Sequence, residues 1–316
     1  MIDLEEHTTL DVHSIGRTAP EFAAFQDEPR QMRSGSVGKS GFLKIEFERR
    51  DRRTILAVAD RRIPYMAQRA LYCDEEMPEL AHVFVITTTG CVLQGDRLNL
   101  DVSLGVGAQA HVTTQSATKI HSMDANYAAQ TQSIRLGEGA YLEFVPEPLI
   151  PHRASRFLSD TQISVAPSAS IVMCEIVQPG RKHHREDEWF GATMLSLATT
   201  AYRPDGQLLF KEKLVVEPSR RSMRSTGVMG SFDVFGNIIL CAPLEKAEAI
   251  YERVSNAVDV AGGVAFGVSR LPNSAGLILK VLGRETDVVK AKVREFVAIA
   301  RKEITGREMR PKYFWR

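Results

Sequence analysis

One pattern occurs three times in the middle of the chain, and it constrains the fold more than any other feature. Each copy has an alternating apolar pair, a tight turn, a pair of small residues and a second strand-like run. The copies begin at Val102, Ile134 and Ile163, so they are 32 and 29 residues apart. A period of this size is typical of stacked supersecondary units, because one unit cannot bury its apolar face alone. We therefore predict a mainly β fold, a layered or helical β scaffold of stacked strand-turn-strand repeats. Three unrelated hairpins in an ordinary sandwich are the alternative.

Small residues occupy equivalent places in the three copies. Gly107 and Gly139 allow the positive φ that tight turns often require. Ala108, Ala140 and Ala169 follow the turns and are small enough for layers to approach closely. The small residues thus support the alignment of the repeats.

Composition places the chain in an ordinary globular class. It has 316 residues, of which 44% are hydrophobic and 25% charged, which is enough for a substantial core. The formal net charge of +1 gives no reason to expect a nucleic-acid partner. No apolar run approaches the roughly 20 residues that span a bilayer, and no signal-peptide core is visible. The four cysteines include no CxxC pair and are expected to be reduced, so we predict a cytoplasmic protein.

The two ends of the chain differ from the repeat region. Residues 1–40 mix Pro, Gly, Ser and alternating charge, so we expect a mobile polar extension. Within it, "GSVGKS" suggests a phosphate-binding loop, but Arg33 stands where the first glycine is required. From residue 41 the apolar residues alternate, and residues 41–316 are expected to form a single β domain.

The last part of the chain predicts two helices. Apolar stripes with helical spacing cover 244–259 and 286–305, with a strand candidate at 276–283 between them. Thr286 is the expected N-cap of the second helix, and Gly306 is the expected residue after its end.

Candidate metal ligands gather in the run "GRKHHREDEW". His183, His184 and Glu186 lie within four residues, followed by Asp187 and Glu188. Imidazole and carboxylate groups suit Ni(II) or Zn(II). Adjacent residues of a strand point to opposite faces, so these groups can meet one ion only if the segment is a loop. A solvated charged loop without metal is the alternative.

Other polar residues stand singly on predicted strands or turns. His111 and His121 flank "VTTQSATKI", and Asp96 follows a glycine as an expected turn residue. Glu143 and Glu147 bracket "FVP" beside a proline-rich bend. The sequence has no nucleophile elbow, HExxH motif, complete Walker loop or dinucleotide fingerprint, so it offers no catalytic constellation of those kinds.

Four segments together resemble the UreD (UreH) family of urease accessory proteins. They are a proline followed by Gln-Arg-x-x-Tyr, a glycine–aspartate turn leading into the G-x-G-A repeat and a Thr-Thr-Gln-x-Ala-Thr-Lys run, a Leu-Glu-aromatic run among prolines, and a Gly-Arg segment. In this chain they occupy 61–75, 88–121, 140–157 and 180–187. The resemblance spans about 41–240, and the first 40 residues are additional to it.

The resemblance implies a maturation factor rather than an enzyme. Proteins of this family bind the accessory protein UreF and, through it, the GTPase UreG, and they dock on the urease apoprotein. The assembly supports GTP-dependent delivery of nickel to urease. The residues that would then contact nickel transiently, with no tightly bound cofactor, are Glu186, His183, His184, Asp96 and Glu143.

Two other functions fit parts of the sequence. A β-helical carbohydrate-active enzyme would use paired carboxylates such as Glu143 and Glu147, although the chain has only two Trp for sugar stacking. A pure adaptor would bind the same proteins without touching nickel. The sequence does not separate an adaptor from a nickel conduit.

Overall fold

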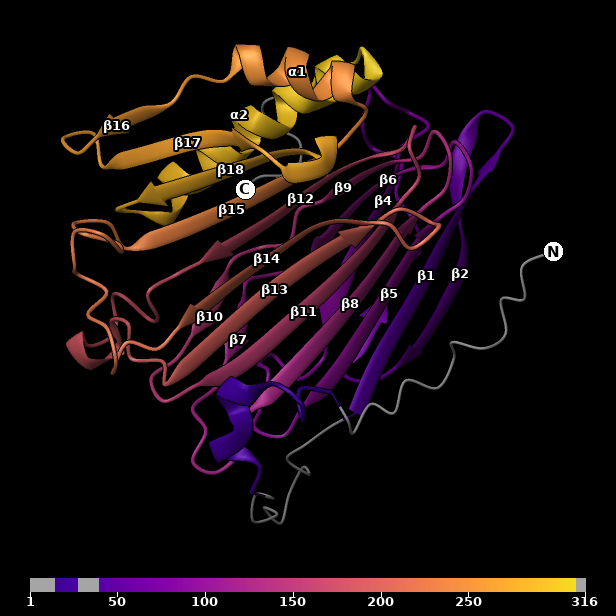
Figure 1. Cartoon of the computed structure of the whole chain (residues 1–316). Helices are drawn as coiled ribbons and strands as arrows, with labels where there is room; N and C mark the ends of the chain where they lie inside the picture. The colour runs from indigo at the N-terminus through magenta and orange to yellow at the C-terminus, as the bar shows by residue number, and fades with distance from the viewer. Residues whose placement is uncertain (1–14, 28–39, 311–316) are drawn as a thin grey trace.

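The computed structural model describes residues 15–27 and 40–310, which form two β-sheets packed face to face with helices on one side (Figure 1). In the seven-stranded sheet the spatial order is β14-β13-β11-β8-β5-β1-β2. Its strands are β1 (Ser40–Arg50), β2 (Arg53–Arg62), β5 (Arg97–Leu104), β8 (Ala128–Leu136), β11 (Arg156–Val165), β13 (Met194–Tyr202) and β14 (Leu208–Val216).

The other sheet has eleven strands, nine of them in the order β16-β17-β18-β15-β12-β9-β6-β4-β3; β10 pairs with β12, and β7 pairs with β10. Its strands are β3 (Tyr65–Ala67), β4 (Ala81–Thr87), β6 (Gln109–Thr114), β7 (Thr118–Ile120), β9 (Tyr141–Phe144), β10 (Leu149–Pro151), β12 (Ser170–Val177), β15 (Val234–Cys241), β16 (Ala257–Asp259), β17 (Val264–Arg270) and β18 (Gly276–Gly283). The helices are η2 (Pro20–Phe25), η3 (Glu186–Glu188), α1 (Leu244–Arg253), η4 (Pro272–Ser274) and α2 (Thr286–Thr305).

The three repeats are stacked layers, as the sequence predicts. Each repeat places its first strand in the seven-stranded sheet and its second strand in the eleven-stranded sheet, and equivalent strands pair in parallel. Val102 lies opposite Ile134, which lies opposite Ile163. The predicted alignment is therefore confirmed residue by residue.

The turns between the sheets also repeat. Gly107 and Gly139 both have a φ of 66°. After the turn, the Tyr141 amide donates to the carbonyl of Ala108 at 2.9 Å, and the next layer repeats this contact. Strand β1 adds an earlier layer, since it pairs in parallel with β5. The stacking thus extends one layer beyond the three copies visible in the sequence.

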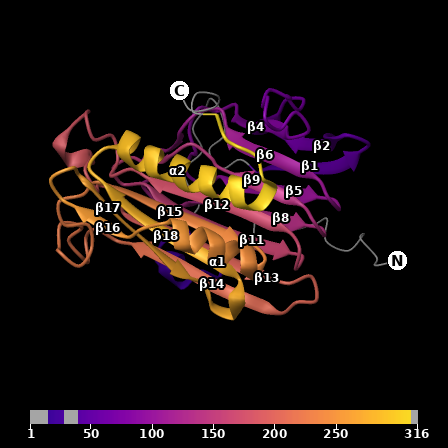
Figure 2. The same ribbon diagram turned by 90° about the horizontal axis from the view of Figure 1, so that it is seen from above.

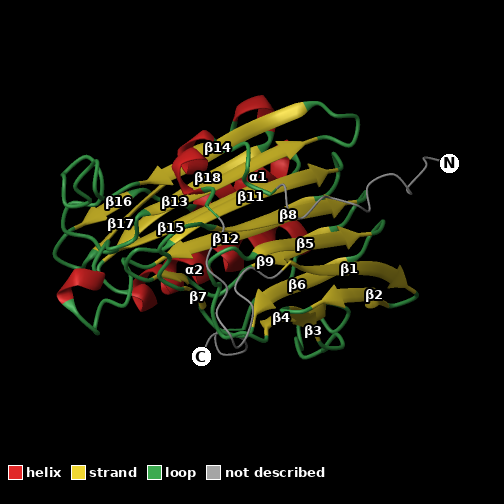
Figure 3. Ribbon diagram, turned by 90° about the horizontal axis from the view of Figure 1, so that it is seen from below, coloured by secondary structure: helices red, strands yellow, loops and turns green. Residues whose placement is uncertain are grey.

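The eleven-stranded sheet is apolar on both faces because it is covered twice. One face meets the seven-stranded sheet in the main core, and the other packs against α1 and α2. Figure 2 shows α2 lying along the sheet over β12 and β15. Seen from the opposite side, the seven-stranded sheet presents its outer face without either α-helix on it (Figure 3). None of the described helices is long and apolar enough to cross a membrane.

The second predicted helix is confirmed, and the first is shorter than predicted. Helix α2 covers Thr286–Thr305 and ends at Gly306, whose φ is 75°. Its N-cap is Glu285 rather than Thr286. Helix α1 ends at Arg253, and 257–259 form β16 instead of a last helical turn. The reason is that the Asn256 side chain accepts a hydrogen bond from the amide of Val268 at 2.7 Å, which holds the chain beside β17.

Part of the predicted N-terminal extension is folded. Residues 15–27 pack on the seven-stranded sheet with Phe22 fully buried, so the expectation of a mobile segment was wrong for them. The apolar side chains of Ile15, Phe22 and Phe25 supply a contact surface that the polar composition of the region obscures. The remainder of 1–39, including "GSVGKS" apart from Ser40, lies outside the described residues.

Candidate functional site

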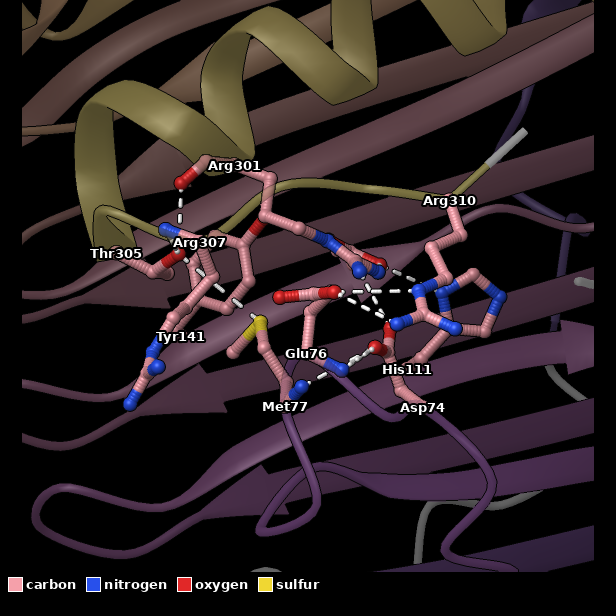
Figure 4. Close-up of polar contacts among 10 residues, drawn as sticks. Asp74, Glu76, Met77, His111, Tyr141, Arg301, Thr305, Arg307 and Arg310 are labelled. Carbon is pink, nitrogen blue, oxygen red and sulfur yellow. Dashed lines mark hydrogen bonds and ion pairs between the residues drawn. The ribbon is translucent and has the colours of Figure 1, made fainter.

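A buried ionic cluster joins α2 to the eleven-stranded sheet. Arg301 is 2% exposed, and it donates to Glu143 on β9 through Nε at 2.7 Å and Nη2 at 2.8 Å. It also donates through Nη1 to Asp74, in the loop before β4, at 2.5 Å. Figure 4 shows the side chains of Arg301 and Asp74 pointing toward one another beneath the end of α2. One guanidinium therefore ties together three segments that are far apart in the chain.

The Glu143 carboxylate has further partners on its own sheet. Nδ1 of His111 lies 2.7 Å from Oε2, and the Tyr141 hydroxyl donates to Oε1 at 2.7 Å. Burial alone would raise the pKa of Glu143, but Arg301 and the His111 hydrogen bond hold this pKa well below its usual range. Burial and the Glu143 charge raise the pKa of Tyr141 well above its usual value. The carboxylate is thus ionised, paired and enclosed.

This arrangement gives Glu143 a structural environment. Both carboxylate oxygens already accept hydrogen bonds from Arg301, and the residue is 0% exposed. Glu147 lies apart from it and pairs with Lys290 of α2 at 2.9 Å. The two carboxylates are therefore each neutralised by a different cation and do not face one another across an open cleft.

A second polar cluster lies between the two sheets. Glu175 on β12, Asn237 on β15 and Lys280 on β18 occupy one row across the eleven-stranded sheet. Glu212 on edge strand β14 faces this row and forms an ion pair with Lys280. The side-chain amide of Asn237 also donates to Glu212 at 3.4 Å, and its Oδ1 is buried with no hydrogen-bond partner among the described residues.

The charges of Glu212 and Lys280 act on Glu175 in opposite directions. Burial, followed by the nearby charge of Glu212, raises the pKa of Glu175 to about 7, whereas Lys280 acts in the opposite direction. At neutral pH Glu175 therefore exchanges a proton readily. Two carboxylates and an amide oxygen close together are hard ligands that also suit a divalent cation.

The cluster adjoins two cavities. A cavity of about 60 Å³ between the sheets is lined by Glu175 together with Tyr65, Gln130, Gln132 and Ser159. An apolar cleft of about 440 Å³ is lined by residues of β14, β15 and β18, among them Lys280. Polar groups therefore continue through the otherwise apolar core, with Glu175 lining one cavity and Lys280 the other.

Asp96 lies at the edge of this interior. It is fully buried, and its Oδ2 accepts the amide hydrogen of Leu93 at 2.8 Å, as expected for a turn residue. Burial chiefly, and the charge of Asp96 in addition, raise the pKa of Tyr65 above its usual value. Tyr65 in turn donates to Gln130 at 3.0 Å within the small cavity. Asp96 is thus near the interior polar groups but held by the turn.

The histidine-rich run forms an exposed loop. Within it, Glu188 is 1% exposed and pairs with Arg181, while Arg185 pairs with Asp187 at 2.7 Å. Neither arginine pairs with Glu186, whose side chain has no ion-pair partner among the described residues. Glu188 therefore organises the loop.

The two histidines of the run lie beside a shallow depression at the start of α2. The structure brings His183 toward Glu285, with Nε2 and Oε2 3.9 Å apart. His184 lines the same depression. The described residues contain no group of three or more potential ligands placed to hold one metal ion. The five predicted nickel contacts are thus distributed over separate places, and their role remains a prediction.

Sequence reasoning missed Glu175, Glu212, Asp74 and Arg301. A signal existed for two of them. Glu175 interrupts the apolar run "SIVMCEIV", and Arg301 follows Val297 by four residues on the buried stripe of α2. A charge within an apolar pattern indicates a buried partner, but the pattern does not say which one.

The fold and the clusters define a class of protein: a β scaffold with a polar interior rather than a closed metal cage. Residues 39–316 match the family model described as "UreD urease accessory protein". A curated "Urease accessory protein UreD" from Yersinia enterocolitica (serotype O:8 / biotype 1B) is 51% identical over 99% of this chain and 98% of its own length. One from Photorhabdus laumondii is 52% identical over 96% of this chain and 95% of its own length. "Urease accessory protein UreD 2" from Brucella suis biovar 1 is 46% identical over 94% of this chain and 98% of its own length.

The chain therefore belongs to the UreD family of urease accessory proteins, and a role in urease maturation follows. The family assignment agrees with the resemblance seen in the sequence and does not favour a carbohydrate-active enzyme. The alignment over 99% of the chain also shows that the first 40 residues are not peculiar to it.

Proposed function

We propose that this protein is a non-catalytic cytoplasmic scaffold through which nickel passes on its way to urease. It binds UreF, and through UreF the GTPase UreG, and it docks on the urease apoprotein. The observation that supports this proposal most is the polar interior, in which Glu175 and Glu212 face one another between two otherwise apolar sheets.

The chemistry of this pair suits transfer better than storage. Lys280 already pairs with Glu212 and its charge also acts on Glu175, so a cation that enters must compete with an ammonium group. A site with few ligands and a competing charge binds and releases, whereas a closed set of four ligands retains its ion. The raised pKa of Glu175 adds a proton as a second competitor. Nickel is the cargo, and the protein supplies oxygen ligands along the route.

The test is a comparison of complexes that differ in one carboxylate. Glu175→Gln preserves shape and removes the charge, and Glu46→Gln on the outer face of β1 is the matched control. Each variant is purified with UreF, UreG and urease apoprotein, activated with GTP, bicarbonate and limiting nickel, and assayed for nickel per urease active site. We expect normal complex composition for both variants and reduced loading only for Glu175→Gln.

Each other outcome has a defined meaning. Normal loading by Glu175→Gln and by Glu212→Gln would show that the interior is not the route; normal loading by Glu186→Ala as well would make the protein an adaptor without metal contact at these residues. Failure of the unaltered chain to bind UreF would reject the proposed assembly itself.

A further inference from the structure

A short N-terminal segment, defined by residues 15–27 and here called the strap, crosses the outer face of the seven-stranded sheet. It is the indigo segment at the bottom of Figure 1. The Phe22 ring lies 4.8 Å from the ring of Tyr127, just before β8, and the guanidinium of Arg156 lies 4.4 Å from the Phe25 ring. The apolar patch beneath the strap consists of Tyr127, Ala129, Leu158 and Met194.

Hydrogen bonds fix both ends of the strap. The Tyr127 hydroxyl donates to the carbonyl of Ile15 at 3.1 Å, and the Asn126 side chain donates to the carbonyl of Asp27 at 2.8 Å. Gly16 has a φ of 77°, and a Cβ there would lie 2.7 Å from the Tyr127 ring. The strap is therefore fitted closely to this place on the sheet.

One charged residue of the strap reaches the edge strand. Glu21 accepts a hydrogen bond from Ser196 on β13 at 2.6 Å and pairs with Lys213 on β14 at 2.7 Å. Partial burial would raise the pKa of Glu21, but the bonds from Lys213 and Ser196 lower it overall. Strand β14 is an edge strand with a neighbouring strand on one side only, so it is easier to displace than the inner strands of this sheet.

The residue beside this contact belongs to the interior cluster. Successive residues of a strand point to opposite faces, so Lys213 points outward to the strap while Glu212 points inward to Lys280. Any movement of β14 that breaks the Glu21–Lys213 pair also moves Glu212 relative to Glu175. The strap and the interior cluster are thus mechanically connected through one strand.

We propose that the strap positions Glu212 by holding edge strand β14 against the sheet, and that its release loosens the interior cluster. Glu21 acts through Lys213 as a positioning residue, and Phe22 anchors the strap. The consequence for nickel rests on the proposed function, whereas the coupling between the strap and β14 does not.

The first experiment measures amide hydrogen exchange in the full chain bound to UreF. We expect Glu21→Gln and Phe22→Ala to speed exchange in 208–216 by about tenfold, because local opening of the edge strand becomes easier. Lys213→Met breaks the same pair from the other side and guards against a folding defect of Phe22→Ala. Ala24→Ser on the exposed side of the strap is the matched control, and β2, the opposite edge strand, should stay unchanged.

The second experiment separates this inference from the proposed function. Glu21→Gln and Glu212→Gln are compared in the nickel-loading assay at equal complex yield, and Glu21→Gln should lower loading less than Glu212→Gln does. Unchanged exchange in 208–216 while 15–27 loses protection would overturn the inference. Faster exchange in 208–216 with normal loading by Glu212→Gln would support the strap and reject the interior route.

Discussion

The Arg301→Met substitution removes a guanidinium that is 2% exposed and leaves the buried carboxylates of Glu143 and Asp74 without this cation. Three charge-assisted hydrogen bonds disappear, while Met keeps much of the length of the apolar stem. Removing one partner of a buried pair costs about 3–5 kcal/mol. His111 and Tyr141 remain beside Glu143, so we expect the lower part of this range.

The loss of unfolding free energy caused by Arg301→Met should be larger at high pH than at low pH. In the unaltered protein the folded pKa of Glu143 lies below its unfolded value, so its contribution is present at neutral pH and is lost as pH falls through the folded pKa. Without Arg301, burial dominates and raises the folded pKa, so protonation of Glu143 relieves the penalty as pH falls. The difference in unfolding free energy between the two proteins should therefore shrink from pH 8 to pH 5.

The assay is urea unfolding followed by circular dichroism at both pH values. Lys302→Met is the matched control, because the neighbouring Lys302 makes only exposed contacts, a hydrogen bond to the Gly306 carbonyl and a pair with Glu308 worth about 0–1 kcal/mol. The double variant Arg301→Met/Glu143→Gln should recover part of the loss, since it removes the unpaired charge. A cost below about 1 kcal/mol for Arg301→Met at pH 8, or a cost independent of pH, would refute the reasoning.

Three further outcomes are expected. Gly139→Val should lower the unfolding free energy by about 1–2 kcal/mol, because its φ of 66° is strained for a β-branched residue although the nearest atom to a Cβ is 4.0 Å away; equal melting temperatures would contradict this. Glu175→Gln should raise the unfolding free energy by more at pH 8 than at pH 5, with a gain of up to about 3 kcal/mol. The folded pKa of about 7 lies above the unfolded pKa, so ionised Glu175 destabilises the folded protein increasingly as pH rises above the unfolded pKa. Urea unfolding that shows the same gain at both pH values would contradict this. Glu186→Ala should leave complex yield and stability unchanged and should reduce nickel per active site if the exposed loop contacts the ion; intact assembly with full loading would eliminate Glu186 as a nickel contact.

The repeat region could be predicted because its signals are local and regular. Alternation identifies the strands, and the recurrence of Gly107 and Gly139 fixes the register in which layers stack. The end of α1 could not be predicted in the same way. An apolar stripe continues into 257–259, and only the presence of β17 beside this segment makes a strand the better solution. Tertiary pairing overrides local periodicity there.

The strap shows a different limit of sequence reasoning. A few apolar residues within a polar region contribute little to an average over the segment. Phe22 nevertheless becomes fully buried, because Tyr127 and Met194 provide an apolar patch made by strands far away in the chain. Such a patch cannot be recognised before the order of the strands is known.

Two glutamates on neighbouring strands show why the sequence could name candidate ligands but could not separate structural carboxylates from those able to bind a cation. Glu143 on β9 lies opposite Val172 on β12, and Glu175 is three residues further along β12. The odd spacing places the two carboxylates on opposite faces of one sheet. Glu143 meets Arg301 of α2 and becomes a permanently paired anion, whereas Glu175 meets a second carboxylate and holds its proton up to about pH 7. A cation in transit needs oxygen atoms that are not already neutralised, so the face on which each glutamate lies decides whether it holds the fold together or can exchange a ligand.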